Sequence, residues 1–276
     1  MIKPVKNFSR KTKSFFISRK TDIDRFSKEA PQGAFLEGHR LTPRVWKAKV
    51  EDMPGRTSPI ITGEIYHLFN RGSEKRDIFL QPRDYDRFRK TFYYYQFSGK
   101  KPKFSFFSKA KLNFSKPISD KKYVEIIGYC LMPNHFHFLI RQLQDNGASR
   151  FIQQFCNSYS KYFNTKYNRV GPLWQNRFKA VRIENDEQLV HVSRYIHLNP
   201  VVSKLIKSID KYPWSSYQEY LIKPIICVPD IVLGLFKNSK DYEKFVIAQV
   251  DYGMELEILK HHQLDDVYDS TPGVEG

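Results

Sequence analysis

The sequence predicts an α+β domain in which an antiparallel sheet carries helices on one face. Two apolar runs, residues 123–132 and 135–142, flank a Pro133-Asn134 step, which is typical of two strands joined at a turn. Residues 61–70 alternate well enough for a first strand. Residues 148–167 carry aromatic side chains every four positions, as in a helix with one buried stripe. These patterns alone leave several other two-layer folds open.

The other elements follow from local signals. Residues 84–97, after Pro82, are expected to form a helix that covers the sheet, and residues 173–183 to form a further strand. Asp186 is the expected N-cap of the next helix. Because a residue before proline disfavours the helical conformation, we expect that helix to kink or end at Asn199-Pro200.

Composition divides the chain into three parts. Residues 1–60 are rich in Lys, Arg, Ser and Pro and predict a loosely ordered basic arm. Residues 61–220 hold the predicted sheet and helices, interrupted by a lysine-rich insertion at 98–122 that is expected to be a loop. Residues 221–276 predict a small helical appendage, within 230–249, and a disordered acidic tail from Asp265.

The charge indicates a polyanionic partner. The 276 residues include 46 basic and 29 acidic side chains, which gives a formal charge of +17. Aromatic residues make up 15% of the chain and many lie among lysines, an arrangement that suits stacking on single-stranded nucleic acid. Basic surfaces also serve solubility or bind anionic membranes. The arm and the insertion are expected to extend the contact with nucleic acid through counterion release, without taking part in chemistry.

Other features narrow the class of protein. No apolar run approaches the ~20 residues of a membrane span, and the N-terminus has no signal-peptide core, so we expect a cytoplasmic protein with no membrane partner. The three cysteines are too few and too scattered for a disulfide framework or a zinc knuckle. They are expected to be reduced and to serve in packing.

Two residue pairs carry the candidate chemistry. His135 and His137 project from the same face of a strand, so both imidazoles can reach one metal ion beside the sheet. Tyr195 and Asn199 lie four residues apart, a spacing that puts them on one face of a helix. A divalent ion held by both histidines and by the amide oxygen of Asn199 would polarise a scissile phosphate beside Tyr195. A phenol, with a pKa of about 10, needs such help to act as a nucleophile.

The other histidines nearby are left out of this site. His197 falls roughly 200° around the helix from Tyr195, and His191 is left out with it. His67, in the first strand, is expected to be a satisfied buried histidine rather than a ligand. A strand histidine is usually structural, and it is the combination of the two pairs that favours a metal site.

Five motifs occur in order along residues 61–220: YHLFNRG, GYCLMPNHFHFLI, LWQNRFKA, YIHLNPV and YPWSSY. In this order they resemble the single-tyrosine HUH transposases, and within them the REP-associated tyrosine transposases. HUH denotes histidine, a hydrophobic residue and histidine, here His135, Phe136 and His137. The resemblance implies a ferredoxin-like fold and a prokaryotic, nucleoid-associated enzyme.

The resemblance also implies a reaction. Tyr195 would attack single-stranded DNA at a hairpin or palindromic repeat, leaving a 5′-phosphotyrosine and a free 3′-hydroxyl, and rejoining would reverse this step. The cofactor would be Mg²⁺ or Mn²⁺, and the protein a monomer or homodimer. Arg71, Arg177 and Lys179 sit in the resembling motifs and are expected to contact DNA phosphates.

Three alternatives remain at this point. The first is a relative that binds hairpin DNA or RNA and no longer cuts, against which the intact quartet of His135, His137, Tyr195 and Asn199 argues. The second is a phosphoesterase with paired HxT motifs. Against it, the chain has a single pair, His135 and His137, which is followed by Phe138. The third is a replication or conjugation nickase, against which the YIHLNPV and YPWSSY motifs argue.

Overall fold

The computed structural model describes residues 59–107 and 118–248. The predicted basic arm, apart from its last two residues, lies outside the described residues, as do residues 108–117 of the insertion and the acidic tail. The described part of the insertion contains one short helix, α4 (Phe104–Phe107).

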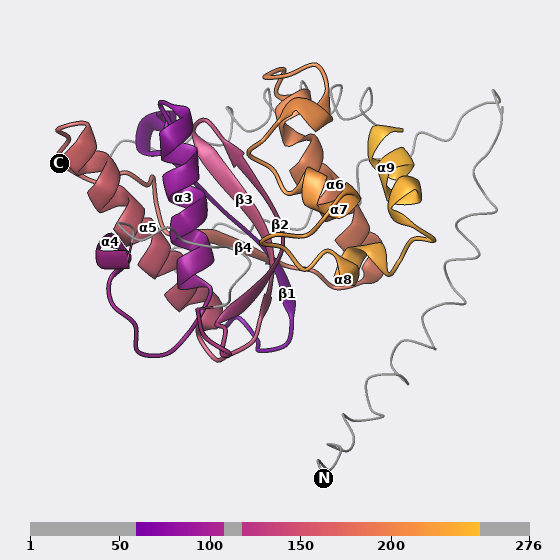
Figure 1. Ribbon diagram of the computed structural model, residues 1–276, viewed down its shortest axis with the longest axis horizontal. Coiled ribbons are helices and arrows are strands. Elements are labelled where there is room, and N and C mark those ends of the chain that lie inside the picture. Colours follow the sequence, from indigo (N-terminus) through magenta and orange to yellow (C-terminus); the bar gives the residue numbers. More distant parts are fainter. Residues whose placement is uncertain (1–58, 108–117, 249–276) are drawn as a thin grey trace, which may run out of the picture. The chain divides into compact units, whose positions relative to one another are not determined.

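The sheet has four strands, β1 (Ile65–Arg71), β2 (Val124–Met132), β3 (His135–Gln142) and β4 (Lys179–Arg182), in the order β2-β3-β1-β4. Every neighbouring pair is antiparallel. Helix α3 (Pro82–Tyr95) connects β1 to β2, and α5 (Gly147–Lys166) connects β3 to β4. This βαββαβ connectivity is that of a ferredoxin-like fold, as the sequence predicts (Figure 1).

Helix α3 begins where its sequence dictates. Pro82 occupies the first turn, where its missing N–H costs nothing, and Gln81 and Asp84 form a reciprocal capping box. The aromatic stripe of α5 is wholly buried, as predicted, and packs with Phe88 of α3 and Phe136 and Phe138 of β3. These aromatic side chains form the core on one side of the sheet.

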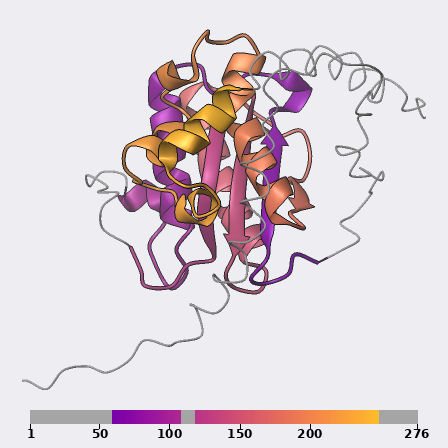
Figure 2. The ribbon, with the colours of Figure 1, turned by 90° about the vertical axis from the view of Figure 1, so that its right-hand side faces the viewer.

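Helices also cover the second face of the sheet (Figures 1 and 2). These are α6 (Asp186–Val202), α7 (Tyr217–Leu221), α8 (Asp230–Leu233) and α9 (Ser239–Ile247), with two 3₁₀ turns elsewhere, η2 (Ser73–Lys75) and η3 (Ile209–Lys211). The predicted helical layer is therefore joined by a second one. The reason lies in β2 and β3, which are apolar and buried on both faces along most of their length.

The structure corrects three predicted boundaries, those of β4 and of the two ends of α6. The strand predicted over 173–183 forms only at 179–182, since Trp174 makes a single bridge to Gly72 and its indole packs into the aromatic core. The N-cap of α6 is Asn185, whose side chain accepts the backbone N–H of Gln188 at 2.8 Å. Helix α6 continues through Pro200 to Val202, because a proline in the last turn removes only one hydrogen bond.

The predicted C-terminal appendage is part of the domain. Val232, Tyr242 and Val246 are fully buried in the same apolar cluster as Ile196 of α6. The hydroxyl of Tyr242 lies 2.7 Å from Nδ1 of His197. Helices α8 and α9 therefore hold α6 from the side away from the sheet.

The YPWSSY motif covers the exposed edge of β2. The backbone N–H of Leu131 donates to the carbonyl of Trp214 at 2.9 Å, and that of Ser216 donates to Tyr129. The Tyr212 hydroxyl donates to the carbonyl of Leu131 at 2.6 Å. An uncovered edge strand is a site of unwanted pairing, so this segment completes the sheet.

We predict that Tyr242→Ala destabilises the whole domain by about 3–5 kcal/mol, because it empties a buried aromatic site and removes the contact with His197. Ile247→Ala, on the same helix but half exposed, should cost less than about 1 kcal/mol. Denaturant unfolding followed by circular dichroism measures both. A separate, early transition in Tyr242→Ala, with the main transition unmoved, would show that α9 is an independent appendage after all.

Candidate functional site

The sheet register places the histidine pair beneath α6. Directly paired residues of antiparallel strands share a face, and Arg71 of β1 pairs with His135 while Phe69 pairs with His137. Phe69 also pairs with Lys179 of β4. The face that carries the two histidines is the one against which α6 packs.

Tyr195 and Asn199 of α6 meet this pair. The ring centroids of His135 and His137 are 4.9 Å apart with planes at 89°, and the Tyr195 ring lies edge-on to His137 at 5.5 Å. The side-chain nitrogen of Asn199 is 3.4 Å from Nε2 of His137, and Asn199 also hydrogen-bonds to His135. The structure thus brings together all four residues predicted to form the site, within one chain.

The orientation of the His135 ring is fixed by its neighbour in the turn. The Nδ2 group of Asn134 donates to the carbonyl of Lys75 at 3.1 Å, so its Oδ1 faces Nδ1 of His135 at 2.6 Å. An amide oxygen only accepts, and Nδ1 therefore carries the proton. In the neutral ring the lone pair is then on Nε2.

Burial keeps His135 neutral. Loss of hydration lowers its pKa to about 4, the nearby positive charge of Arg71 acts in the same direction, and the hydrogen bond with Asn199 opposes them. A neutral imidazole is the form that binds metal ions. Burial thus disfavours protonation of His135 and leaves one ring nitrogen able to bind a metal ion.

The donor set fits a divalent cation. Among residues 59–107 and 118–248, no group of three His, Cys, Asp or Glu side chains is arranged to hold a metal ion. The candidate site therefore depends on two imidazoles and the neutral amide of Asn199, which is buried beside them. Nitrogen and oxygen donors of this kind, with positions open to substrate, suit an ion that acts on a phosphate.

The predicted DNA contacts lie around this pair. Arg71 is directly opposite His135 in the sheet register, and Lys179 is exposed on the same face, one strand beyond Phe69. Arg177 is exposed in the segment before β4, which joins the end of β1 through a hydrogen bond from Gln175 N–H to the carbonyl of Arg71. The three cations lie in segments beside the histidine pair.

The sequence analysis did not include two residues, Asn134 and His67, that lie in this site. Asn134 holds His135, as described above. His67 was predicted to be a satisfied buried histidine, and it is buried with its Nε2 at 2.9 Å from Nδ1 of His137. The alternation of strand residues puts His67 and Phe69 on one face, but the partner strand decides what they touch.

The excluded histidines stay outside the site. His197 is fully buried, between the Tyr242 hydroxyl and the Ser216 hydroxyl at 2.7 and 2.8 Å. His191 contacts Arg194 and the ring of Phe245. Both side chains secure the packing of α6.

Comparison with known proteins supports the family resemblance. Residues 106–199 match the family described as "Transposase IS200 like". The chain is 30% identical over 105 residues to a Haemophilus influenzae protein named as a REP-associated tyrosine transposase. The chain is thus similar to a REP-associated tyrosine transposase over part of its length. That match covers 34% of this chain and 58% of the relative's length.

A solved structure is also similar. It is described as a REP-associated tyrosine transposase bound to a REP hairpin, with a TM-score of 0.44 and 19% identity, over 63% of this chain and 88% of the other. The segment shared with the transposase family, residues 106–199, includes His135, His137, Tyr195 and Asn199.

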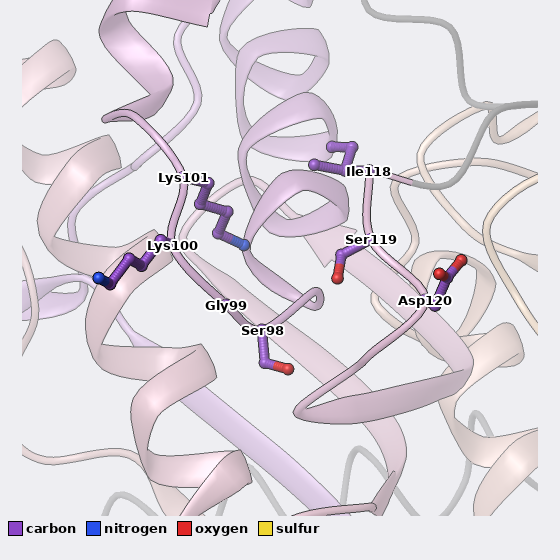
Figure 3. A pocket seen from close by; sticks show the side chains of 7 residues that line it. All are labelled: Ser98, Gly99, Lys100, Lys101, Ile118, Ser119 and Asp120. Carbon is purple, nitrogen blue, oxygen red and sulfur yellow. The ribbon is translucent and has the colours of Figure 1, made fainter.

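A further feature of the structure lies apart from the histidines. A hollow of about 380 Å³ lies beside the start of β2, at the end of that strand away from the His135 turn, and is shown in Figure 3. There Lys101 donates to the carbonyls of Tyr94 and Phe97, at the end of α3, and burial lowers its pKa to about 8. Lys101 thus serves as a cap of that helix rather than as a catalytic group.

Two further expectations can be compared with the structure. All three cysteines are buried and free, as predicted. None of the helices within the described part of the chain is long and apolar enough to cross a membrane.

Proposed function

We propose that this protein is a metal-dependent transposase that cleaves and rejoins single-stranded DNA at hairpin or repeat sequences through a 5′-phosphotyrosine intermediate. The observation that carries the proposal is the meeting of Tyr195 and Asn199 with His135 and His137 on the face of the sheet covered by α6. A family member that only bound DNA would not require this quartet.

His135, His137 and Asn199 are the residues that would hold Mg²⁺ or Mn²⁺. When bound, the ion would supply positive charge to the scissile phosphate and stabilise the charge that develops there. The neutral imidazole of His135 and its fixed Nε2 support this role.

Tyr195 is the proposed nucleophile. Its phenol oxygen forms a bond to phosphorus and loses its proton, while the bond from phosphorus to the 3′-oxygen breaks and that oxygen takes up a proton as a 3′-hydroxyl. The ring is only partly buried, and its edge-on contact with His137 sets its position. In rejoining, a 3′-hydroxyl attacks the phosphotyrosine, so the phosphodiester energy is conserved.

The DNA partner is supported by charge. The chain carries a formal charge of +17, and Arg71, Arg177 and Lys179 lie around the proposed phosphate site. Phosphate contacts of this kind position a strand without reading its sequence. The hairpin or repeat is part of the proposal because the matched relative is named as REP-associated.

We predict that Tyr195→Phe keeps folding and DNA binding but abolishes the covalent adduct, because only the nucleophilic oxygen is removed. The assay incubates the purified protein with Mn²⁺ and a pool of labelled single-stranded hairpins and separates adducts by denaturing electrophoresis. Tyr66→Phe, on the other face of the sheet, is the matched control. An adduct in Tyr195→Phe would assign the nucleophile to another residue, and no adduct with the unmodified chain would favour the non-cleaving alternative.

We predict that His135→Ala or His137→Ala abolishes cleavage and weakens Mn²⁺ binding, whereas Asn199→Ala does so less completely. A neutral amide oxygen is the weaker ligand, and water can replace it. Isothermal titration with Mn²⁺ measures the affinities, with His191→Ala as the control, since His191 lies outside the site. Unchanged Mn²⁺ affinity in both His135→Ala and His137→Ala would rule out the proposed metal site.

We predict that Arg177→Ala and Lys179→Ala weaken binding of single-stranded DNA regardless of its sequence. Each substitution should reduce the slope of log K against log salt by about 0.7, the value expected for one phosphate contact on a single strand. Fluorescence anisotropy at several salt concentrations measures the slope, and Lys240→Ala, exposed on α9, is the control. Slopes equal to that of the control would exclude these residues as phosphate contacts.

A further inference from the structure

We infer that His67 is a positioning residue, which holds the His137 ring with its proton on Nδ1 and so turns the lone pair of Nε2 toward the phosphate site. This inference deepens the proposed function and rests on it for the identity of the site. His67 itself touches neither the proposed ion nor the scissile phosphate and acts through His137.

The contact between these two rings is specific. Nε2 of His67 lies 2.9 Å from Nδ1 of His137, with the ring centroids 5.1 Å apart and the planes nearly parallel at 24°. The side chains are diagonal neighbours on adjacent strands, because His67 pairs with Leu139 and Phe69 with His137. Both histidines are buried, so water is a poor substitute for either partner.

The direction of the hydrogen bond follows from the other side of His137. Asn199 places its Nδ2 group 3.4 Å from Nε2 of His137. An amide nitrogen only donates, so this approach suits a lone pair on Nε2 and a proton on Nδ1. Nδ1 of His137 then donates to Nε2 of His67.

The same arrangement occurs at the other histidine. Asn134 accepts the Nδ1 proton of His135, as His67 accepts that of His137. Both imidazoles are thus held from Nδ1 and present Nε2, although the two holders come from different segments. Ligand histidines characteristically have such a partner, which fixes tautomer and ring orientation.

His67 also contacts the proposed nucleophile. Its ring meets that of Tyr195 edge-on at a centroid distance of 6.0 Å, and Tyr195 meets His137 in the same manner. His67 on β1 therefore contacts both His137 of the sheet and Tyr195 of α6. A residue that only filled space would be replaceable by any ring of similar size.

Two variants separate these roles. His67→Phe fills the space but offers no acceptor, whereas His67→Gln can place its amide oxygen near the position of Nε2. His191→Phe is the control, since it removes a half-buried histidine outside the site. Thermal unfolding of the full chain reports any general loss of structure.

The first measurement is the tautomer of His137 in the full chain, without metal or DNA, from long-range ¹H–¹⁵N spectra assigned with His137→Ala. We expect the Nδ1–H form in the unmodified protein and in His67→Gln, and a mixture of tautomers in His67→Phe. An Nε2–H tautomer in the unmodified protein, or an unchanged tautomer in His67→Phe, would overturn the inference. Because this readout needs no ion, it stands even if the proposed metal site fails.

The second measurement is Mn²⁺ affinity by isothermal titration. We expect His67→Phe to bind Mn²⁺ about 10–100-fold more weakly, the usual effect of losing such a partner, and His67→Gln to recover most of that loss. Equal losses in His67→Phe and His67→Gln would reduce His67 to a packing residue. If both His135→Ala and His137→Ala leave Mn²⁺ binding intact, the metal part of the proposed function fails while the tautomer measurement still decides the role of His67.

Discussion

The register of β1 against β3 is the constraint on which the site depends. It puts Arg71 opposite His135 and brings His67 into hydrogen-bonding distance of His137. Because successive strand residues point to opposite faces, a slip of one residue would move the histidines into the aromatic core on the side of α3 and α5. The packing of that core therefore fixes the chemistry on the other face, since Phe136 and Phe138 cannot be buried there unless His135 and His137 face α6.

Helix α6 is the second part of the arrangement, and it is held from two sides. The sheet lies beneath it, and α8 and α9 pack on it from the other side around Tyr242. His197 links these layers through polar contacts with Tyr242 and Ser216, the latter in the segment that covers the edge of β2. A buried polar network of this kind favours one position of the helix over small sliding movements, and that position sets where Tyr195 meets His137.

The electrostatics of the site follow from burial and from the neighbouring cations. Burial and Arg71 together lower the pKa of His135 to about 4, so the imidazole is neutral where a ligand atom is required. Positive charge near the histidines comes instead from Arg71 and Lys179, which are suited to phosphate oxygens. The proposed nucleophile, the proposed ligands and the proposed phosphate contacts thus occupy one face of the sheet, with neutral groups at its centre and cations around them.

The sequence by itself determined the elements whose signals are local. Alternation and helical spacing correctly predicted the strand pair and the buried stripe of α5. They also placed His135 and His137 on one face of a strand, and Tyr195 and Asn199 on one face of a helix. Only the tertiary structure decided what these pairs meet. The second helical layer, the place of α9 in the core and the contact of His67 with His137, 70 residues apart, all depend on which strands and helices become neighbours. Periodicity specifies the face on which a side chain lies, whereas its partner across that face is fixed by the packing of segments distant in the chain.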